Sequence, residues 1–187
     1  VVEKVPEAIV ETLKDSGLQS KDVATYAFVA LDNLVGNRPK LRTQLGESGA
    51  CKAIIETVKI FQNDPMVLKT AISLIANLVL DNAANADRFI AEDAFQVVID
   101  SAFQHVEDST LCHSSFLFIL STSSFSKDSI VALLNANVCL LVSKTLKAHP
   151  GNGSIVDICC VATQYMLSGN EVMNERVGRE IIDQNTY

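Results

Sequence analysis

The stretch VLKTAISLIANLVLDN, which spans Val67–Asn82, decides the fold. Ten of its first fourteen residues are aliphatic or alanine, yet Asn77 interrupts them. The same arrangement occurs in YAFVALDNLVG, Tyr26–Gly36, where Asn33 lies 44 residues before Asn77. Similarity at a fixed spacing of about 20 to 50 residues is the sequence signature of repeat proteins. The two stretches therefore predict a repeat of about 44 residues.

The same step relates other positions along the chain. Starting from Ala27 and Leu31, it reaches small and aliphatic residues in the second unit and matches more loosely in the last two units. One unit of this size cannot bury its apolar face alone, so stacked units are expected to share a continuous core. The residues reached are Asn77, Ser121 and Tyr165 from Asn33, Ala71, Ser115 and Cys159 from Ala27, and Ile75, Ile119 and Thr163 from Leu31.

Local patterning divides each full unit into a short helix, an amphipathic helix and a more hydrophobic third helix. Asp64 is a candidate N-cap for the third helix of the second unit, with Pro65 at its first position. The segment SSFLFILSTSSF (114–125) fits a third helix, although Phe, Ile and Thr also favour strands. We predict an all-α solenoid in one domain over residues 1–187, with units at about 1–36, 37–81, 82–125 and 126–169 and a partial unit at 170–187.

The first unit lacks its short helix and the partial unit has only that helix, so we expect this chain to be a fragment of a longer protein. Composition supports helices packed on helices, because the chain is 48% hydrophobic, only 6% aromatic, and poor in Gly (8) and Pro (4). No apolar run reaches the roughly 20 residues that cross a bilayer, so we predict no membrane span.

The formal net charge is −7, and residues 63–110 carry two basic and eight acidic residues. This balance argues against nucleic acid as a partner, because that binding rests on neutralising phosphates. It fits either a basic partner or a solvated acidic face.

The cysteines are odd in number and form no C-x-x-C pair, and most sit among apolar residues. We therefore predict buried free thiols, and with them a reducing compartment such as the cytoplasm. The five are Cys51, Cys112, Cys139, Cys159 and Cys160.

The segment LGESGACKAIIETVKIFQNDPMVLKTAISLIANLV (45–79) resembles an armadillo repeat. The pattern of that family is a short helix ending near Gly, an amphipathic helix, a polar turn and a third helix ending in A-L-x-N-L. The first two units match it best, with Ala27, Asn33 and Leu34, and with Gly49, Ala71, Asn77 and Leu78. The later units have Asp93-Ala94 and Ser121, then Asn137 and Tyr165, at the Gly and Asn sites. HEAT repeats are the near alternative. The resemblance covers essentially the whole chain and implies a right-handed superhelix of about four armadillo-like three-helix repeats.

The third helix of the second unit carries one polar stripe, because Lys69, Ser73 and Asn77 are four residues apart on a helix that is otherwise mostly apolar. The resemblance implies that third helices line a concave groove, where the matching asparagine hydrogen-bonds the main chain of an extended peptide. The alternative is that Asn33 and Asn77 only cap or satisfy the backbone near their helix ends. Carried along by 44 residues, the stripe predicts the partner-binding residues that we call the ladder: Thr25, Val29, Asn33, Lys69, Ser73, Asn77, His113, Leu117, Ser121, Asp157, Val161 and Tyr165.

The ligand is expected to differ from those of well-known family members. Members that recognise nuclear localisation signals place a Trp four residues before the asparagine, where this chain has Val29, Ser73, Leu117 and Val161. Other members have strongly basic grooves, whereas this chain is acidic around its second unit. The three aliphatic residues predict apolar contacts with the ligand instead.

Residues that carry chemistry are sparse. The three histidines, His105, His113 and His149, are not at metal-ligand spacing, and HPGNGS (149–154) lacks the phosphate-loop pattern. We therefore expect no metal, no cofactor and no catalysis. The sequence predicts a non-catalytic protein–protein interaction module that binds an extended peptide or helix in the groove. The alternative is a structural segment of a larger scaffold or assembly.

Overall fold

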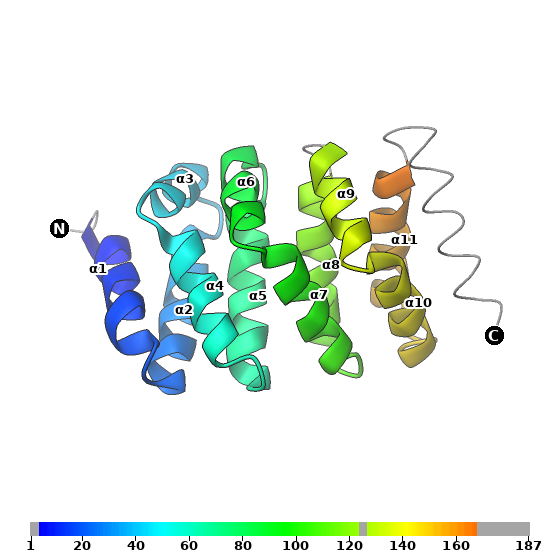
Figure 1. Ribbon diagram of the computed structural model, residues 1–187, viewed down its shortest axis with the longest axis horizontal. Coiled ribbons are helices and arrows are strands. Elements are labelled where there is room, and N and C mark those ends of the chain that lie inside the picture. The colour runs from blue at the N-terminus through cyan, green and yellow to red at the C-terminus, as the bar shows by residue number, and fades with distance from the viewer. Residues whose placement is uncertain (1–3, 124–126, 168–187) are drawn as a thin grey trace.

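The structure is a computed structural model, and it describes residues 4–123 and 127–167. Every regular element in these two ranges is a helix. Figure 1 shows the helices side by side in one row that runs from the N-terminus to the C-terminus. This arrangement confirms the predicted all-α solenoid, in which each unit packs only on its neighbours.

The helices follow the predicted period. Each helix from α5 onward begins 44 residues after its counterpart in the preceding unit. The three full units are α3 (Pro39–Glu47), α4 (Ala50–Ile60) and α5 (Pro65–Val79); α6 (Ala83–Ala91), α7 (Ala94–Gln104) and α8 (Ser109–Ser123); and α9 (Lys127–Asn135), α10 (Val138–Ala148) and α11 (Gly153–Leu167). They are preceded by α1 (Val5–Thr12), a π-helical turn η2 (Leu13–Gly17) and α2 (Lys21–Val35).

The third helices, α2, α5, α8 and α11, begin at equivalent capping residues. The Asp64 carboxylate accepts from the backbone N–H groups of Met66 and Val67 at 3.0 and 3.2 Å, and α5 starts at Pro65, as predicted. The other third helices are capped by side chains at steps of 44 residues, namely Ser20, Asp108 and Asn152. The segment that also suited a strand is helical in α8 as far as Ser123.

The second helices, α4, α7 and α10, begin after a left-handed residue. These residues are Gly49, Asp93 and Asn137, with φ of 84°, 61° and 64°. Gly adopts this conformation without cost, and Asn and Asp tolerate it better than other residues do. The two positions where the chain departs from the glycine of the armadillo pattern therefore keep its backbone conformation.

Helix α5 shows why the third helices form the centre of the array. It lies between α2 and α8 and buries apolar side chains around most of its circumference, including Leu68, Ile72 and Ile75. Lys69, Ser73 and Asn77 are left half-buried on its remaining side. The polar stripe predicted from sequence is thus the one open face of α5.

A buried polar contact joins α3 to α6. Asn85 is fully buried, and its Nδ2 donates to the backbone oxygens of Arg42 and Leu78, both at 2.9 Å. The Asn85 Oδ1 accepts from Arg88 at 2.9 Å. The Arg42 side chain is itself buried and donates to the backbone oxygens of Leu80, at 3.0 Å, and Gly36. These bonds satisfy carbonyl groups near the helix ends where two units meet.

Some of the predicted units include residues outside the ranges that the structure describes. The partial unit at 170–187 lies outside the described residues, as do residues 124–126, which follow α8 in the sequence. Among the helices that are described, none alone is long and apolar enough to cross a membrane, while Ser129–Asn135 and Val138–Ala148 pass that test together with a bend of 66° between them. The assignment of the whole chain to one domain stays a prediction.

Candidate functional site

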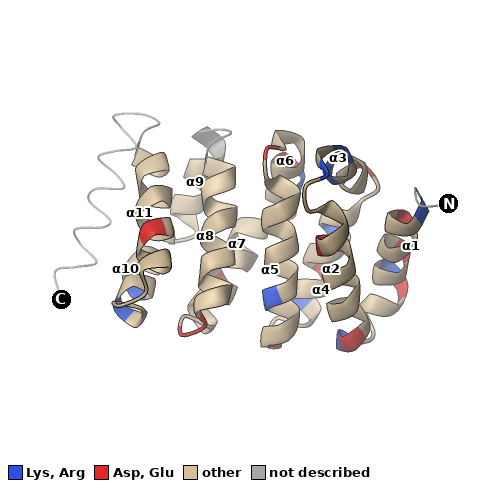
Figure 2. Cartoon of the chain, turned by 180° about the vertical axis from the view of Figure 1, so that it is seen from behind, with Lys and Arg blue, Asp and Glu red and all other residues tan. Residues whose placement is uncertain are grey.

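The predicted ladder lies on four neighbouring third helices. In Figure 2, α2, α5, α8 and α11 stand side by side on the near face of the array, with the second helices α4, α7 and α10 behind them. Every ladder residue is exposed or half-buried, so all of them belong to this third-helix face rather than to the core. The structure thus places on one face residues that are up to 140 positions apart in the chain.

A cavity of about 300 Å3 lies between α2, α5 and α8. Four ladder residues line it, Val29, Asn33, Lys69 and Ser73. The other residues of its wall are Asp32, Met66, Thr70, Thr110 and Ser114. The cavity therefore offers hydroxyl and amide groups that donate and accept hydrogen bonds, one carboxylate and one ammonium group, beside two exposed apolar side chains.

Asp32 is held from the neighbouring unit by two ladder residues. The Ser73 hydroxyl donates to its Oδ2 at 2.9 Å, and the Asn77 Nδ2 donates to its Oδ1 at 2.7 Å. The carboxylate on α2 is thereby fixed against the open face of α5. The Asn33 amide is exposed and makes no side-chain hydrogen bond to the described residues.

Both lysines on the third helices pair with capping aspartates. The Lys21 ammonium lies 2.9 Å from Asp64, and that of Lys69 lies 3.4 Å from Asp108. The hydrogen bond from Lys21 holds the pKa of Asp64 below its usual value, with help from the backbone N–H of Val67. Each cation on this face is therefore already turned towards an acidic group of the chain itself.

The part of the face on α8 and α11 is more apolar. Leu117 and Val161 are each 37% exposed, and Tyr165 is 45% exposed. Asp157 is the one acidic residue on these two helices. These residues, with Thr25, His113 and Ser121, lie on the same face but outside the cavity.

The sequence prediction missed five wall residues of the cavity. Met66 and Thr70 lie three positions before ladder residues, and Thr110 and Ser114 follow them by 44 residues, so a second stripe one turn along each helix indicates them. Asp32 gives no such signal, because a step of four residues from Asn33 never reaches its immediate neighbour. Its role depends on donors from the next unit.

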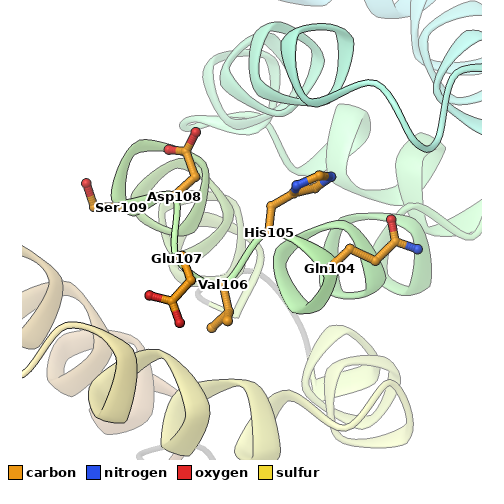
Figure 3. Close-up of a pocket in the computed structure, with 6 residues that line it drawn as sticks. All are labelled: Gln104, His105, Val106, Glu107, Asp108 and Ser109. Carbon is orange, nitrogen blue, oxygen red and sulfur yellow. The ribbon is translucent and has the colours of Figure 1, made fainter.

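A second cavity, of about 590 Å3, is lined by the loop between α7 and α8, residues 104–109. Figure 3 shows its side chains pointing apart, with Glu107 and Val106 on one side and Asp108 and His105 on the other. The Nε2 of His149 lies 2.7 Å from the Val106 carbonyl, and Asp108 caps α8. No three His, Cys, Asp or Glu side chains of the described part of the chain could hold a metal ion. These divergent groups do not form a reaction centre.

Comparison with known proteins identifies the fold. An engineered protein from a structural genomics consortium superposes with a TM-score of 0.81 at 17% identity, over 96% of this chain and 71% of that one. A designed armadillo repeat protein in complex with the peptide (KR)4 gives 0.79 at 19% identity, over 95% and 71%. Another designed armadillo repeat protein gives 0.78 at 15%, over 93% and 69%. No protein-family model and no curated protein matches the chain. The chain therefore has an armadillo-like repeat fold.

Proposed function

We propose that this chain is a non-catalytic interaction module that binds an extended peptide segment of a partner protein along its third-helix face. The observation that carries the proposal is the cavity between α2, α5 and α8, which lies in the same row of third helices as exposed Leu117 and Val161. A designed armadillo repeat protein that is similar in fold is in complex with the peptide (KR)4, which supports peptide binding as a use of this fold.

The chemistry of the face suits a main chain. The backbone N–H and C=O groups of a helix bond to one another, whereas those of an extended peptide have no partner within the peptide and need donors and acceptors from the protein. The exposed Asn33 amide and the hydroxyls of Thr110 and Ser114 offer both kinds of partner, while the Thr70 hydroxyl donates to the backbone oxygens of Met66 and Val67 and can only accept. Aliphatic side chains nearby supply apolar area, which contributes most of the affinity in peptide grooves.

Selection from a phage library of random peptides tests the proposal. Peptides of about twelve residues span four helices packed 8–10 Å apart. We expect selected peptides to lose affinity for Leu117→Ser, because that substitution removes exposed apolar area; Ser73 stands at the equivalent position, so the helix tolerates it. Ile60→Ser on α4 is the matched control, since Ile60 is also exposed (52%) but lies on a second helix. Equal loss of affinity in both variants, or in neither, would contradict the proposal.

A second candidate function is a structural segment of a larger assembly. An apolar cavity of about 390 Å3 between α10 and α11 favours it, with walls that include Val142, Leu146 and Leu167. Such a surface fits further helices of a scaffold better than solvent. Self-association that disappears in Leu146→Gln, measured by light scattering, would support this role. A monomer at all concentrations would count against it.

A further inference from the structure

We infer that the bound peptide is cationic and aliphatic: one Lys or Arg side chain enters the cavity beside Asp32, and aliphatic side chains pack on Leu117 and Val161. This inference rests on the proposed peptide-binding function and names the chemistry of the ligand. Such a peptide is neither uniformly basic nor uniformly acidic. Its charged residue lies on one half of the face, and its aliphatic residues make apolar contacts on the other half.

The first argument is the balance of charge on the third helices. Their two lysines are already paired with Asp64 and Asp108, which lie just before α5 and α8. Asp32 has no cation within ion-pair distance among the described residues; its partners are a hydroxyl and an amide. The ionised groups of these helices are Lys21, Asp22, Asp32, Lys69 and Asp157. The charge left without a counter-ion is therefore negative.

The second argument is the geometry of the Asp32 carboxylate. Ser73 and Asn77 each occupy one acceptor site, on different oxygens. A carboxylate has about four such sites, so each oxygen keeps room for a further donor. An ammonium or guanidinium group can donate to both oxygens. Because the carboxylate is already fixed in place, little conformational freedom is lost when the cation binds.

The third argument is the apolar part of the cavity wall. Met66 and Val29 line it and are 57% and 40% exposed. The methylene stem of a Lys or Arg side chain packs on such surfaces while its charged head meets a polar partner. Lys69 also lines the cavity, but its ammonium lies 3.4 Å from Asp108 at the start of α8. The end of the cavity near Asp32 is the one that fits a cation.

The spacing of the helices sets the spacing of the peptide. Asp32 is on α2, so α8 and α11 lie two and three helix spacings away from it. Neighbouring helices lie about 9 Å apart and an extended chain advances about 3.3 Å per residue, so these two helices lie about five to eight residues from the cation. Side chains of an extended peptide alternate in direction. We therefore expect aliphatic residues at the sixth or eighth position from the Lys or Arg, on the same side of the peptide.

The same phage library provides the test, because the composition of the selected peptides is the readout. Against the unmodified chain we expect Lys or Arg to be enriched at a fixed, even spacing from aliphatic residues. Against Asp32→Asn we expect the aliphatic preference to remain and the cation preference to be lost. Asp22→Asn is the matched control, since Asp22 is exposed on the same helix and lies outside the cavity.

Synthetic peptides then measure the size of the effect. For a selected peptide we expect about tenfold weaker binding to Asp32→Asn, and about tenfold weaker binding when its Lys is replaced by norleucine, the scale of one charged hydrogen bond. Thermal unfolding checks that the variant is folded. Peptides that bind with sensitivity to Leu117→Ser but without a preferred cation would overturn this inference and leave the proposed function intact. Failure to select any peptide sensitive to Leu117→Ser would overturn both.

Discussion

Gly46 on α3 lies directly against Asn85 on α6, so that a Cβ atom on Gly46 would stand 1.8 Å from the Asn85 Oδ1. Asn85 is fully buried and donates hydrogen bonds to the backbone oxygens of Arg42 and Leu78, so its side chain cannot move away from an added Cβ atom without losing these bonds. We expect Gly46→Ala to lower the free energy of unfolding by about 1–3 kcal/mol, the range of overpacked cores. Urea unfolding measures this change.

Gly151→Ala is the matched control, because nothing lies within 4 Å of the position of its Cβ. Asn85→Ala alone should also destabilise the chain, since it leaves two buried carbonyl groups without their donor. If contact with Asn85 is the cause, Gly46→Ala should cost less in the Asn85→Ala background than in the unmodified chain. Strictly additive losses would contradict that cause.

The left-handed residues before the second helices predict different changes in stability for substitutions at two of these sites. Gly49→Ala should destabilise the chain by about 1 kcal/mol, because its φ of 84° is strained for a residue with a Cβ. Asn137→Gly, at the equivalent position, should leave stability unchanged or raise it slightly. Thermal unfolding of the two variants checks the pair. If Asn137→Gly destabilised the chain and Gly49→Ala did not, side-chain contacts rather than φ would govern the stability at these two sites.

Acid sensitivity is expected at the cap of α8. Partial burial acts to raise the pKa of Asp108, but the backbone N–H of Leu111 and the charge of Lys69 outweigh it and hold that pKa below its usual value. A carboxyl whose pKa is lower in the folded state stabilises the fold above its unfolded pKa, near 3.8, and loses that effect as pH falls through its folded pKa. Asp108→Asn should therefore destabilise the chain at pH 6 and much less at pH 2.5.

The measurement is urea unfolding at both pH values. Asp87→Asn serves as the control, since Asp87 is an exposed carboxyl on α6. A loss of stability in Asp108→Asn that is the same at both pH values would mean that the Asp108 charge contributes nothing.

The cysteines differ sharply in accessibility. None of the five forms a disulfide, which confirms that part of the sequence prediction, but Cys160 is exposed while the other four are buried. Burial raises the pKa of Cys51 and of Cys159 to about 12, and that of Cys112 to about 11. At pH 8 we expect one thiol to react quickly with a disulfide reagent and the rest only after denaturation. The fast phase should vanish in Cys160→Ser, and a second fast thiol would contradict the burial of the other four cysteines.

The fold could be predicted from the sequence because several independent local features indicate the 44-residue repeat. The asparagines at 33 and 77 are one step of 44 residues apart, the capping residue at 64 has counterparts at 20, 108 and 152, and the left-handed residue at 49 has counterparts at 93 and 137. Such local signals determine where each helix begins, and therefore which face of the helix a given residue occupies. The ladder could therefore be placed on the third-helix face without knowledge of how the units pack.

The cavity could not be predicted in the same way. Its wall depends on which side chains of adjacent units approach one another, and that depends on the angle between helices rather than on spacing within one. Asp32 illustrates the limit: it looks like any polar residue near a helix end, and only Ser73 and Asn77 from the next unit show that it is held in place. The resemblance assigned the Asn77 amide to a ligand, whereas one of its N–H groups is engaged by Asp32.

This engagement leads to the most discriminating prediction for the site. We expect Asn77→Ala to weaken the binding of a selected peptide by about 1–2 kcal/mol, the scale of a hydrogen bond to a charged group. Two causes are distinguishable. If Asn77 acts by positioning the Asp32 carboxylate, the loss should fall below about 0.5 kcal/mol in the Asp32→Asn background, because the charge it positions is gone. If Asn77 binds the peptide main chain with its remaining N–H and its carbonyl oxygen, as the armadillo resemblance implies, the loss should be the same in both backgrounds. Fluorescence anisotropy with one labelled peptide and the four proteins of this cycle measures the difference, with thermal unfolding of each protein as the check on folding.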